Sequence, residues 1–207
     1  MTANLLIPRK DEEQQEATDW RDIVYFPELV AQLAELDETL GQLRYALSDR
    51  TIDPGFVLED IDDVTGEGFH RCQRYMRRRI GPNPWAPGPD RRFPRALHCG
   101  PVVGKRYLAE AIWAGANYWK HDGEWPLDER RLSDRQRPTL RLFRDLGVVD
   151  NEYMLLNLLK VLREDHFTLS PLADQLVLWR IAFDTEVSSP SKQQRHKRRR
   201  RTRRSTP

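Results

Sequence analysis

The chain has 207 residues, of which 39% are hydrophobic and 32% charged, a composition typical of a soluble protein with a sizeable core. No run of about 18 apolar residues exists, and no basic segment followed by an apolar one opens the chain. We therefore expect a cytoplasmic protein with no membrane span and no secretory leader. Cys72 and Cys99 are too few for a disulfide framework, so we expect reduced thiols.

Charge is strongly segregated along the chain. Residues 1–69 carry a net charge of −12, residues 70–106 a net charge of +9, and residues 107–187 a net charge of −4. The tail, residues 188–207, holds nine Lys and Arg residues and no acid. The formal total of +2 is therefore a cancellation between an acidic front and two basic segments. The acidic front can neutralise the basic middle within one fold, whereas the tail has no evident internal partner.

The first predicted helix begins near Pro27 and ends before Asp49. Leucines recur along it at spacings of four and three, which is the apolar stripe of an amphipathic helix. These are Leu29, Leu33, Leu36, Leu40, Leu43 and Leu47.

A second helix is predicted over 66–80. One face is apolar and carries Phe69, Cys72, Met76 and Ile80, and another face carries Arg71, Arg74 and Arg78. Five prolines in the next fourteen residues exclude a helix or a central strand there. We therefore predict a proline-rich connector over 81–100.

A central helix is predicted over 101–121, with Pro101 at its start and Asp122-Gly123 as its stop. Ala and Gly at positions 109, 111, 114, 115 and 116 would let another helix approach closely. Three shorter helices are predicted at 138–146, 151–164 and 171–186. The fold class expected is all-α: a bundle of five to six helices in a single domain, 1–187, followed by a disordered basic tail, 188–207.

The end of the central helix carries the densest group of polar and aromatic residues, in the stretch GANYWKHDGEW. Asn117 and His121 are four residues apart, which places them on one helical face, and Lys120 is adjacent.

The N-x-x-x-H spacing of Asn117 and His121 resembles the signature of HEPN-superfamily proteins, which are small helical bundles found among prokaryotic toxins and defence ribonucleases. The resemblance implies a metal-independent ribonuclease site with His121 as acid–base, Asn117 as orienting group and Lys120 as the cation. It also implies RNA rather than DNA as partner, and a homodimer. Ala116 stands where the family has a catalytic arginine, so the motif is degenerate and an altered or inactive member is expected.

The same residues also fit an ordinary helix end. A histidine beside a helix C-terminus can bond the last carbonyls, and the aromatic residues can belong to the core. We keep this alternative open beside a catalytic site and a noncatalytic nucleotide or RNA pocket, and whether the protein is an enzyme is left undecided.

Two His/Cys pairs are candidate zinc ligands. The pairs are His70 with Cys72 and His98 with Cys99, and both have shorter spacers than zinc pairs normally show. Cys72 also lies on the apolar face of its helix, where a buried free thiol is common. Phosphate-loop, dinucleotide, metalloprotease and nucleophile-elbow motifs do not occur in the sequence. We expect no metal and no cofactor.

The basic tail is a polycation that we expect to bind nucleic-acid phosphates without base discrimination. Its basic residues are Lys192, Arg195, Lys197, Arg198, Arg199, Arg200, Arg201, Arg203 and Arg204. The face of Arg71, Arg74 and Arg78 extends that surface in one interpretation. In the other, it pairs with the acidic N-terminal region, above all with residues 59–63.

The sequence therefore predicts a nucleic-acid-binding helical protein, with RNA favoured by the resemblance alone. The alternatives are a noncatalytic adaptor that binds another protein and an active metal-independent ribonuclease.

Overall fold

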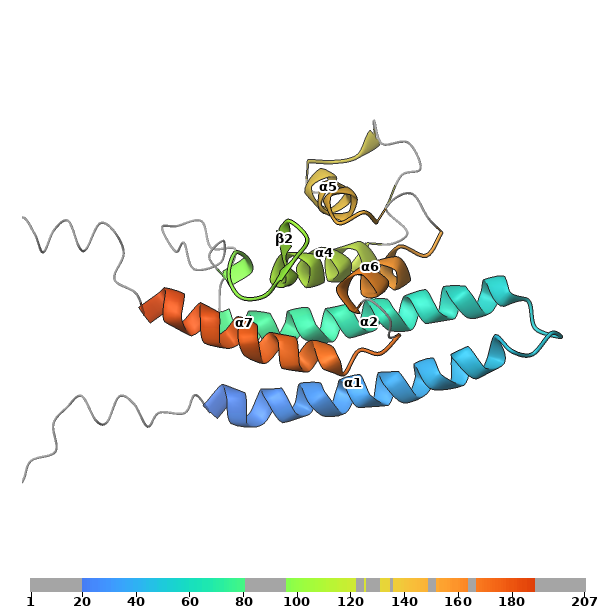
Figure 1. Ribbon diagram of the computed structural model, residues 1–207, viewed down its shortest axis with the longest axis horizontal. Helices are drawn as coiled ribbons and strands as arrows, with labels where there is room; N and C mark the ends of the chain where they lie inside the picture. The colour runs from blue at the N-terminus through green and yellow to red at the C-terminus, as the bar shows by residue number, and fades with distance from the viewer. Residues whose placement is uncertain are drawn as a thin grey trace, which may run out of the picture.

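The computed structural model describes residues 20–80, 96–121, 125, 131–134, 136–148, 152–163 and 167–188. These residues form six α-helices and one two-stranded sheet (Figure 1). The all-α fold class expected from the sequence is confirmed. Residues 189–207 of the predicted tail and residues 81–95 of the predicted connector lie outside the described residues.

The first two helices form a long antiparallel hairpin (Figure 1). α1 spans Trp20–Ala46 and α2 spans Pro54–Ile80. The leucine stripe of α1 supplies its buried face, as predicted, except that Leu47 lies beyond the helix end and is exposed. The predicted start at Pro27 is wrong, because α1 begins seven residues earlier. Pro27 lies on the exposed side of α1, where water can hydrate the backbone carbonyl that the missing N–H leaves without a donor.

α2 begins twelve residues before its predicted start. The carboxylate of Asp53 accepts a hydrogen bond from the backbone N–H of Gly55 at 2.8 Å, and Pro54 is the first helical residue. An aspartate cap followed by proline is a strong helix start, since proline has no N–H to leave unsatisfied in the first turn. The sequence contains this signal, and the acidic run behind it obscured the apolar positions Val57 and Ile61, both of which are buried.

The segment predicted as the start of the central helix is a hairpin. β1 (Val102–Val103) pairs antiparallel with β2 (Arg106–Tyr107), and Gly104 turns the chain with φ +58°. Glycine adopts this left-handed conformation without the steric cost that a side chain imposes. The central helix, α4, therefore spans Leu108–Lys120 and does not begin at Pro101.

A capping box fixes the start of α4. The carboxylate of Glu110 accepts a hydrogen bond from the backbone N–H of Tyr107 at 3.1 Å, which satisfies one of the amides that a helix N-terminus leaves without a partner.

The three remaining helices lie within three residues of their predicted limits. α5 spans Arg137–Asp145, α6 spans Met154–Arg163 and α7 spans Pro171–Ser188. Gly147, with φ +80°, follows α5 as the sequence indicated.

α2 lies at the centre of the bundle and contacts α1, α4, α6 and α7 (Figure 1). Small residues on α4 allow this close packing, as predicted. A Cβ atom at Gly115 would lie 2.9 Å from side-chain atoms of both Phe69 and Leu158. The described helices share one hydrophobic core, in which Phe69, Ile112 and Trp179 are fully buried.

Two carboxylates of the α1–α2 hairpin hold the starts of α6 and α7. Asp62 accepts a hydrogen bond from the backbone N–H of Leu156 at 2.7 Å. Asp37 accepts the N–H groups of Leu169 at 2.5 Å and Ser170 at 2.9 Å. Helix N-termini present unpaired N–H groups and a partial positive charge, so an aspartate there is stabilising. Part of the acidic front thus anchors the later helices.

Gly66→Ala tests the close contact of α2 with its neighbours. An added Cβ would overlap the Trp119 indole and lie 2.7 Å from Leu155, so we expect a loss of about 1–3 kcal/mol in the free energy of unfolding. Urea denaturation measures it. The matched control is Gly41→Ala on α1, where a Cβ meets nothing within 4 Å and we expect a gain of about 0.5–1 kcal/mol. Equal effects of the two substitutions would contradict this account of the packing.

Candidate functional site

Gln73 of α2 connects two of the three residues singled out on the central helix. Its side chain is 1% exposed. Nε2 donates to Asn117 Oδ1 at 3.0 Å and to the Trp113 carbonyl at 3.3 Å, and Oε1 accepts from Lys120 Nζ at 2.7 Å. A buried amide that is satisfied in this way holds its partners in fixed positions. Asn117 and Lys120 are three residues apart and both face α2.

His121 is placed differently from Asn117 and Lys120. It is the C-cap residue of α4, with φ −120° and ψ 22°, and its backbone N–H donates to the Tyr118 carbonyl at 3.1 Å. Its side chain is exposed. The helix therefore ends at the histidine, as the helix-end alternative requires, while an exposed imidazole stays accessible to a ligand.

The aromatic residues of the motif contact α2 and one another. The Trp119 indole N–H donates to Asp63 Oδ1 at 2.5 Å, and its ring lies 5.5 Å from that of His70. Tyr118 stacks on Trp125 with ring centroids 4.9 Å apart. The indole N–H of Trp125 donates to the Tyr118 carbonyl at 2.9 Å. These contacts give the aromatic side chains a structural role.

We use the term polar cluster for His70 and Gln73 of α2 with Asn117 and Lys120 of α4. Burial lowers the pKa of His70, and the positive charges of Lys120, Arg71 and Arg74 lower it further. Burial also lowers the pKa of Lys120, and Arg77 adds to the effect. Both shifts have cationic neighbours among their causes, so the cluster sits in a positive potential. Within the described chain, His70 Nδ1 is buried without a hydrogen-bond partner.

On the arginine face of α2, some side chains form ion pairs with acids and one is exposed to solvent. Arg78 donates to Glu28 of α1 at 2.9 Å and lies over the Tyr25 ring at 4.0 Å. Arg71 pairs with Glu67 one turn earlier on α2. Arg74 is exposed. Pairing with the acidic front therefore occurs, through Glu28 and Glu67.

Arg79, which lies next to that face, pairs with Asp184 of α7 at 2.7 Å. Asp62 and Asp63, from the expected acidic run, instead accept the hydrogen bonds from Leu156 and Trp119. The nine basic residues of the tail lie outside the described residues: Lys192, Arg195, Lys197, Arg198, Arg199, Arg200, Arg201, Arg203 and Arg204.

Of the four residues in the two His/Cys pairs, only His70 belongs to the polar cluster. Cys72 is fully buried, and burial raises the pKa of its thiol to about 12. Burial, with Glu186 and Asp184, raises the pKa of the Cys99 thiol to about 11. Among the described residues, no group of three or more His, Cys, Asp or Glu side chains is arranged to hold a metal ion. No helix among them is long and apolar enough to cross a membrane.

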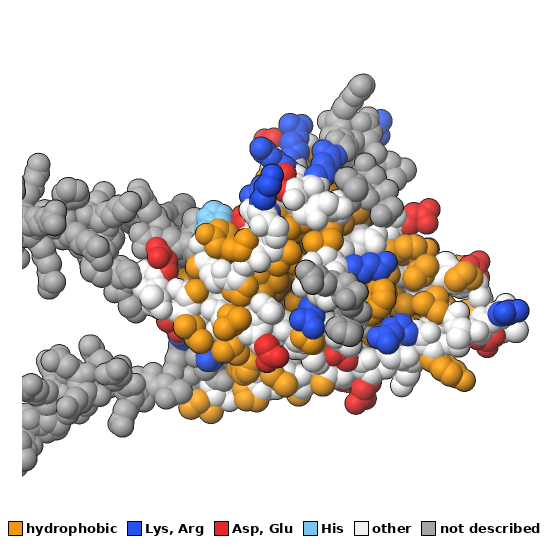
Figure 2. Space-filling view, viewed as in Figure 1, with side chains coloured by type: hydrophobic (Ala, Val, Ile, Leu, Met, Phe, Trp, Pro, Cys, Tyr) orange, Lys and Arg blue, Asp and Glu red, His pale blue; other side chains and the backbone are white. Residues whose placement is uncertain are grey.

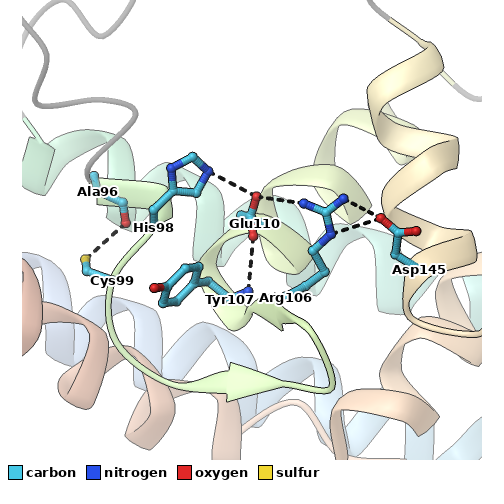
Figure 3. Close-up of polar contacts among 7 residues, drawn as sticks. All are labelled: Ala96, His98, Cys99, Arg106, Tyr107, Glu110 and Asp145. Atoms are coloured by element: carbon cyan, nitrogen blue, oxygen red, sulfur yellow. Dashed lines mark hydrogen bonds and ion pairs between the residues drawn. The ribbon is translucent and has the colours of Figure 1, made fainter.

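His98 belongs to a separate surface network (Figure 3). Its Nε2 lies 3.2 Å from Glu110 Oε1, and Arg106 bridges Glu110, at 3.7 Å, to Asp145 of α5. This network ties the hairpin and the start of α4 to α5.

Sequence reasoning singled out Asn117 and Lys120 but missed Gln73. The missed signal is present in the sequence, because Gln73 interrupts the stripe formed by Phe69 and Met76 at the same helical spacing. A polar side chain on a buried face needs a hydrogen-bond partner, so its position predicts a polar residue on the facing helix.

Comparisons with protein-family models, with curated proteins and with solved structures find no match to this chain.

Lys120→Met tests whether the cluster sits in a positive potential. We expect NMR titration to give His70 a pKa below its ordinary value of 6.5, and the substitution to raise it, since one of the neighbouring positive charges is removed. Lys160→Met is the control. Lys160 lies on α6, bonds to Asn157 and is not among the charges that act on His70. An unchanged His70 pKa in Lys120→Met would contradict the electrostatic account.

The lowered pKa of His70 makes the free energy of unfolding depend on pH. The folded state favours the neutral His70 imidazole, so its contribution to stability is complete above the ordinary pKa of 6.5. It declines as the pH falls below that value, because the unfolded chain then binds the proton more readily. His70→Gln is expected to flatten urea-denaturation stability over this acidic window relative to the wild type. An identical pH profile in the two proteins would be evidence against the shift.

Proposed function

We propose that the protein binds nucleic acid, with the polar cluster and its cationic surroundings as the folded contact and the basic tail as a second contact. One observation carries the proposal: α2 and α4 bring Lys120, Arg74 and Arg77 into one region around a buried amide. Positive charges that lie close together repel one another. A bound anion reduces this repulsion, so the region favours phosphate.

The geometry suits a phosphate ligand in two respects. Lys120 is already held by Gln73 at 2.7 Å, so less side-chain freedom is lost when an anion binds. Arg77 is exposed and its charge acts on Lys120, and guanidinium groups can donate two parallel hydrogen bonds to a phosphate. Such contacts position a nucleic-acid backbone and carry no sequence information.

RNA is the partner that the HEPN resemblance favours, and the same resemblance implies a homodimer. Under that hypothesis the exposed His121, next to Lys120, is the group with the chemistry to act on a ribose hydroxyl. The ribonuclease alternative therefore depends on His121, whereas binding depends on the cations. A single set of variants separates the two.

Fluorescence anisotropy with a labelled single-stranded RNA is the test. We expect the full chain to bind, with an affinity that falls steeply as salt rises. Replacing Arg198, Arg199, Arg200 and Arg201 by Gln should weaken binding and reduce the salt dependence, and Lys120→Gln should reduce it by about one further counterion. Lys160→Gln serves as the matched control.

The recovered RNA is then analysed on a gel. RNA that is cut by the wild type and left intact by His121→Ala would support the ribonuclease alternative. Absence of RNA and DNA binding by the full chain at low salt would refute the proposed function.

An adaptor is the second candidate, because apolar side chains are exposed on two helices that contact each other. Val24 and Val30 of α1 and Leu178 and Ile181 of α7 are exposed, and Figure 2 shows hydrophobic side chains gathered over these helices. Contiguous exposed apolar surface is typical of a protein-binding face. Sedimentation of the wild type and of the double variant Leu178→Glu, Ile181→Glu tests one such partner, a second copy of the chain.

A further inference from the structure

α5 carries arginines on one face and buried residues on the other. Arg137, Arg141 and Arg144 recur at spacings of four and three, which aligns them along one side of a helix. All three are exposed. Leu142 and Phe143 point the other way and are buried. Figure 2 shows Lys and Arg side chains gathered over the end of the molecule where α5 lies.

Both ends of α5 are fixed by local structure. Pro138 stands in its first turn, which suits a residue without an N–H. Beyond its C-terminus, Gly147 donates to the Arg144 carbonyl at 2.9 Å and Val148 donates to the Phe143 carbonyl at 2.8 Å. This pair of bonds, with both Val148 and Phe143 buried, is a Schellman motif.

The buried side of α5 is anchored to the central helix. The ring of Phe143 lies 5.5 Å from that of Tyr118 of α4, and α5 packs against α4. The arginine side chains therefore project from a rigid helix. Little backbone conformational entropy is lost when a ligand binds to them.

The acid at the end of α5 is already neutralised. Asp145 pairs with Arg106 of β2 (Figure 3). That bond lowers the pKa of the Asp145 carboxyl, and the charges of Arg141 and Lys105 lower it further. Lys105 is exposed in the hairpin turn. Arg141 and Lys105 therefore contribute positive potential to the same surface, where the second acid of the network, Glu110, is shared by Arg106 and His98.

We propose that this arginine face of α5, together with Lys105, binds the sugar–phosphate backbone of a nucleic acid. The three arginines span about 10 Å along the helix axis. One strand of a duplex presents about three phosphates over that length. The choice of a nucleic acid as partner rests on the proposed function. The surface itself is separate from the polar cluster and from the tail.

A row of guanidinium groups without lysines among them favours phosphate over a generally acidic protein surface. Arginine presents a planar fork of donors that matches phosphate oxygens, and it is more weakly hydrated than lysine. Repeated arginines on a fixed helix suit a ligand whose charges repeat at a regular spacing. An acidic polypeptide presents carboxylates without such a constraint and is the competing occupant.

The double variant Arg141→Gln, Arg144→Gln in the full chain tests the proposal. Arg137 is left in place because its Nε donates to the Leu132 carbonyl at 3.2 Å. The matched control is Arg44→Gln, Arg50→Gln, which removes two exposed arginines, one in the last turn of α1 and one in the α1–α2 turn. Arg44 donates to the Phe167 carbonyl at 3.4 Å, so the folding of this variant is verified as well. Binding of a labelled single-stranded RNA, of a duplex DNA and of polyglutamate is measured over a salt series, and circular dichroism verifies folding.

For RNA or DNA we expect the slope of log affinity against log salt to fall by about two in the α5 variant, and to stay at the wild-type value in the control. Wild-type slopes in the α5 variant, with binding lost only in the tail variant, would overturn this inference and leave the proposed function standing. A loss confined to polyglutamate would also overturn it, in favour of an acidic protein. A wild type that binds neither nucleic acid would remove the proposed function as well.

Discussion

The packing of α2 against α4 depends on two positions that carry no side chain, Gly66 and Gly115. A Cβ at Gly66 would overlap the Trp119 indole, and one at Gly115 would press on Phe69 and Leu158. Because both helices also pack against α6, any increase in their separation would open the core. The same closeness lets the short amide of Gln73 reach Asn117 and the Trp113 carbonyl. The polar cluster is thus a consequence of how closely the two helices can approach.

The acidic front serves the fold through individual contacts. Asp37 and Asp62 accept backbone N–H groups at the starts of α7 and α6, where a negative charge also complements the helix dipole. Glu28 pairs with Arg78 across the hairpin. Glu67 likewise pairs with Arg71. The acidic front therefore neutralises part of the basic middle of the chain, while Arg74 and Arg77 remain exposed.

The described basic residues fall into two groups with different consequences. Arg78 and Arg79 bind acids on α1 and α7 and contribute to the contacts between helices. Arg74 and Arg141 are exposed, and both raise the positive potential at neighbouring titratable groups. Only the exposed arginines of the second group can release water and counterions when they bind a phosphate backbone. Arginine therefore has two roles in this protein. Some arginines stabilise the contacts between helices, and others supply the exposed charge on which the proposed binding of nucleic acid depends.

The sequence by itself determined most of the helices and part of the candidate site. The leucine period of α1, the glycine after α5 and the Ser-Pro start of α7 act within a few residues, so their effect can be derived locally. Asn117 and Lys120 were singled out in the same way. The early start of α2 at Asp53-Pro54 was missed although its signal is local, because the acidic run behind it weakens the apolar period.

Only the tertiary structure determines which side chains contact one another across the helices. Gln73 and Asn117 are 44 positions apart, and no local pattern says which helix faces which. The stretch that begins at Pro101 is helix-compatible in sequence, yet it forms a hairpin because the pairing of Val102–Val103 with Arg106–Tyr107 and the cap from Glu110 satisfy its backbone in another way. The partners of the arginines on α2 and α5 were likewise set by the relative placement of helices, since an ion pair depends on a distance in space that charge along the chain does not specify.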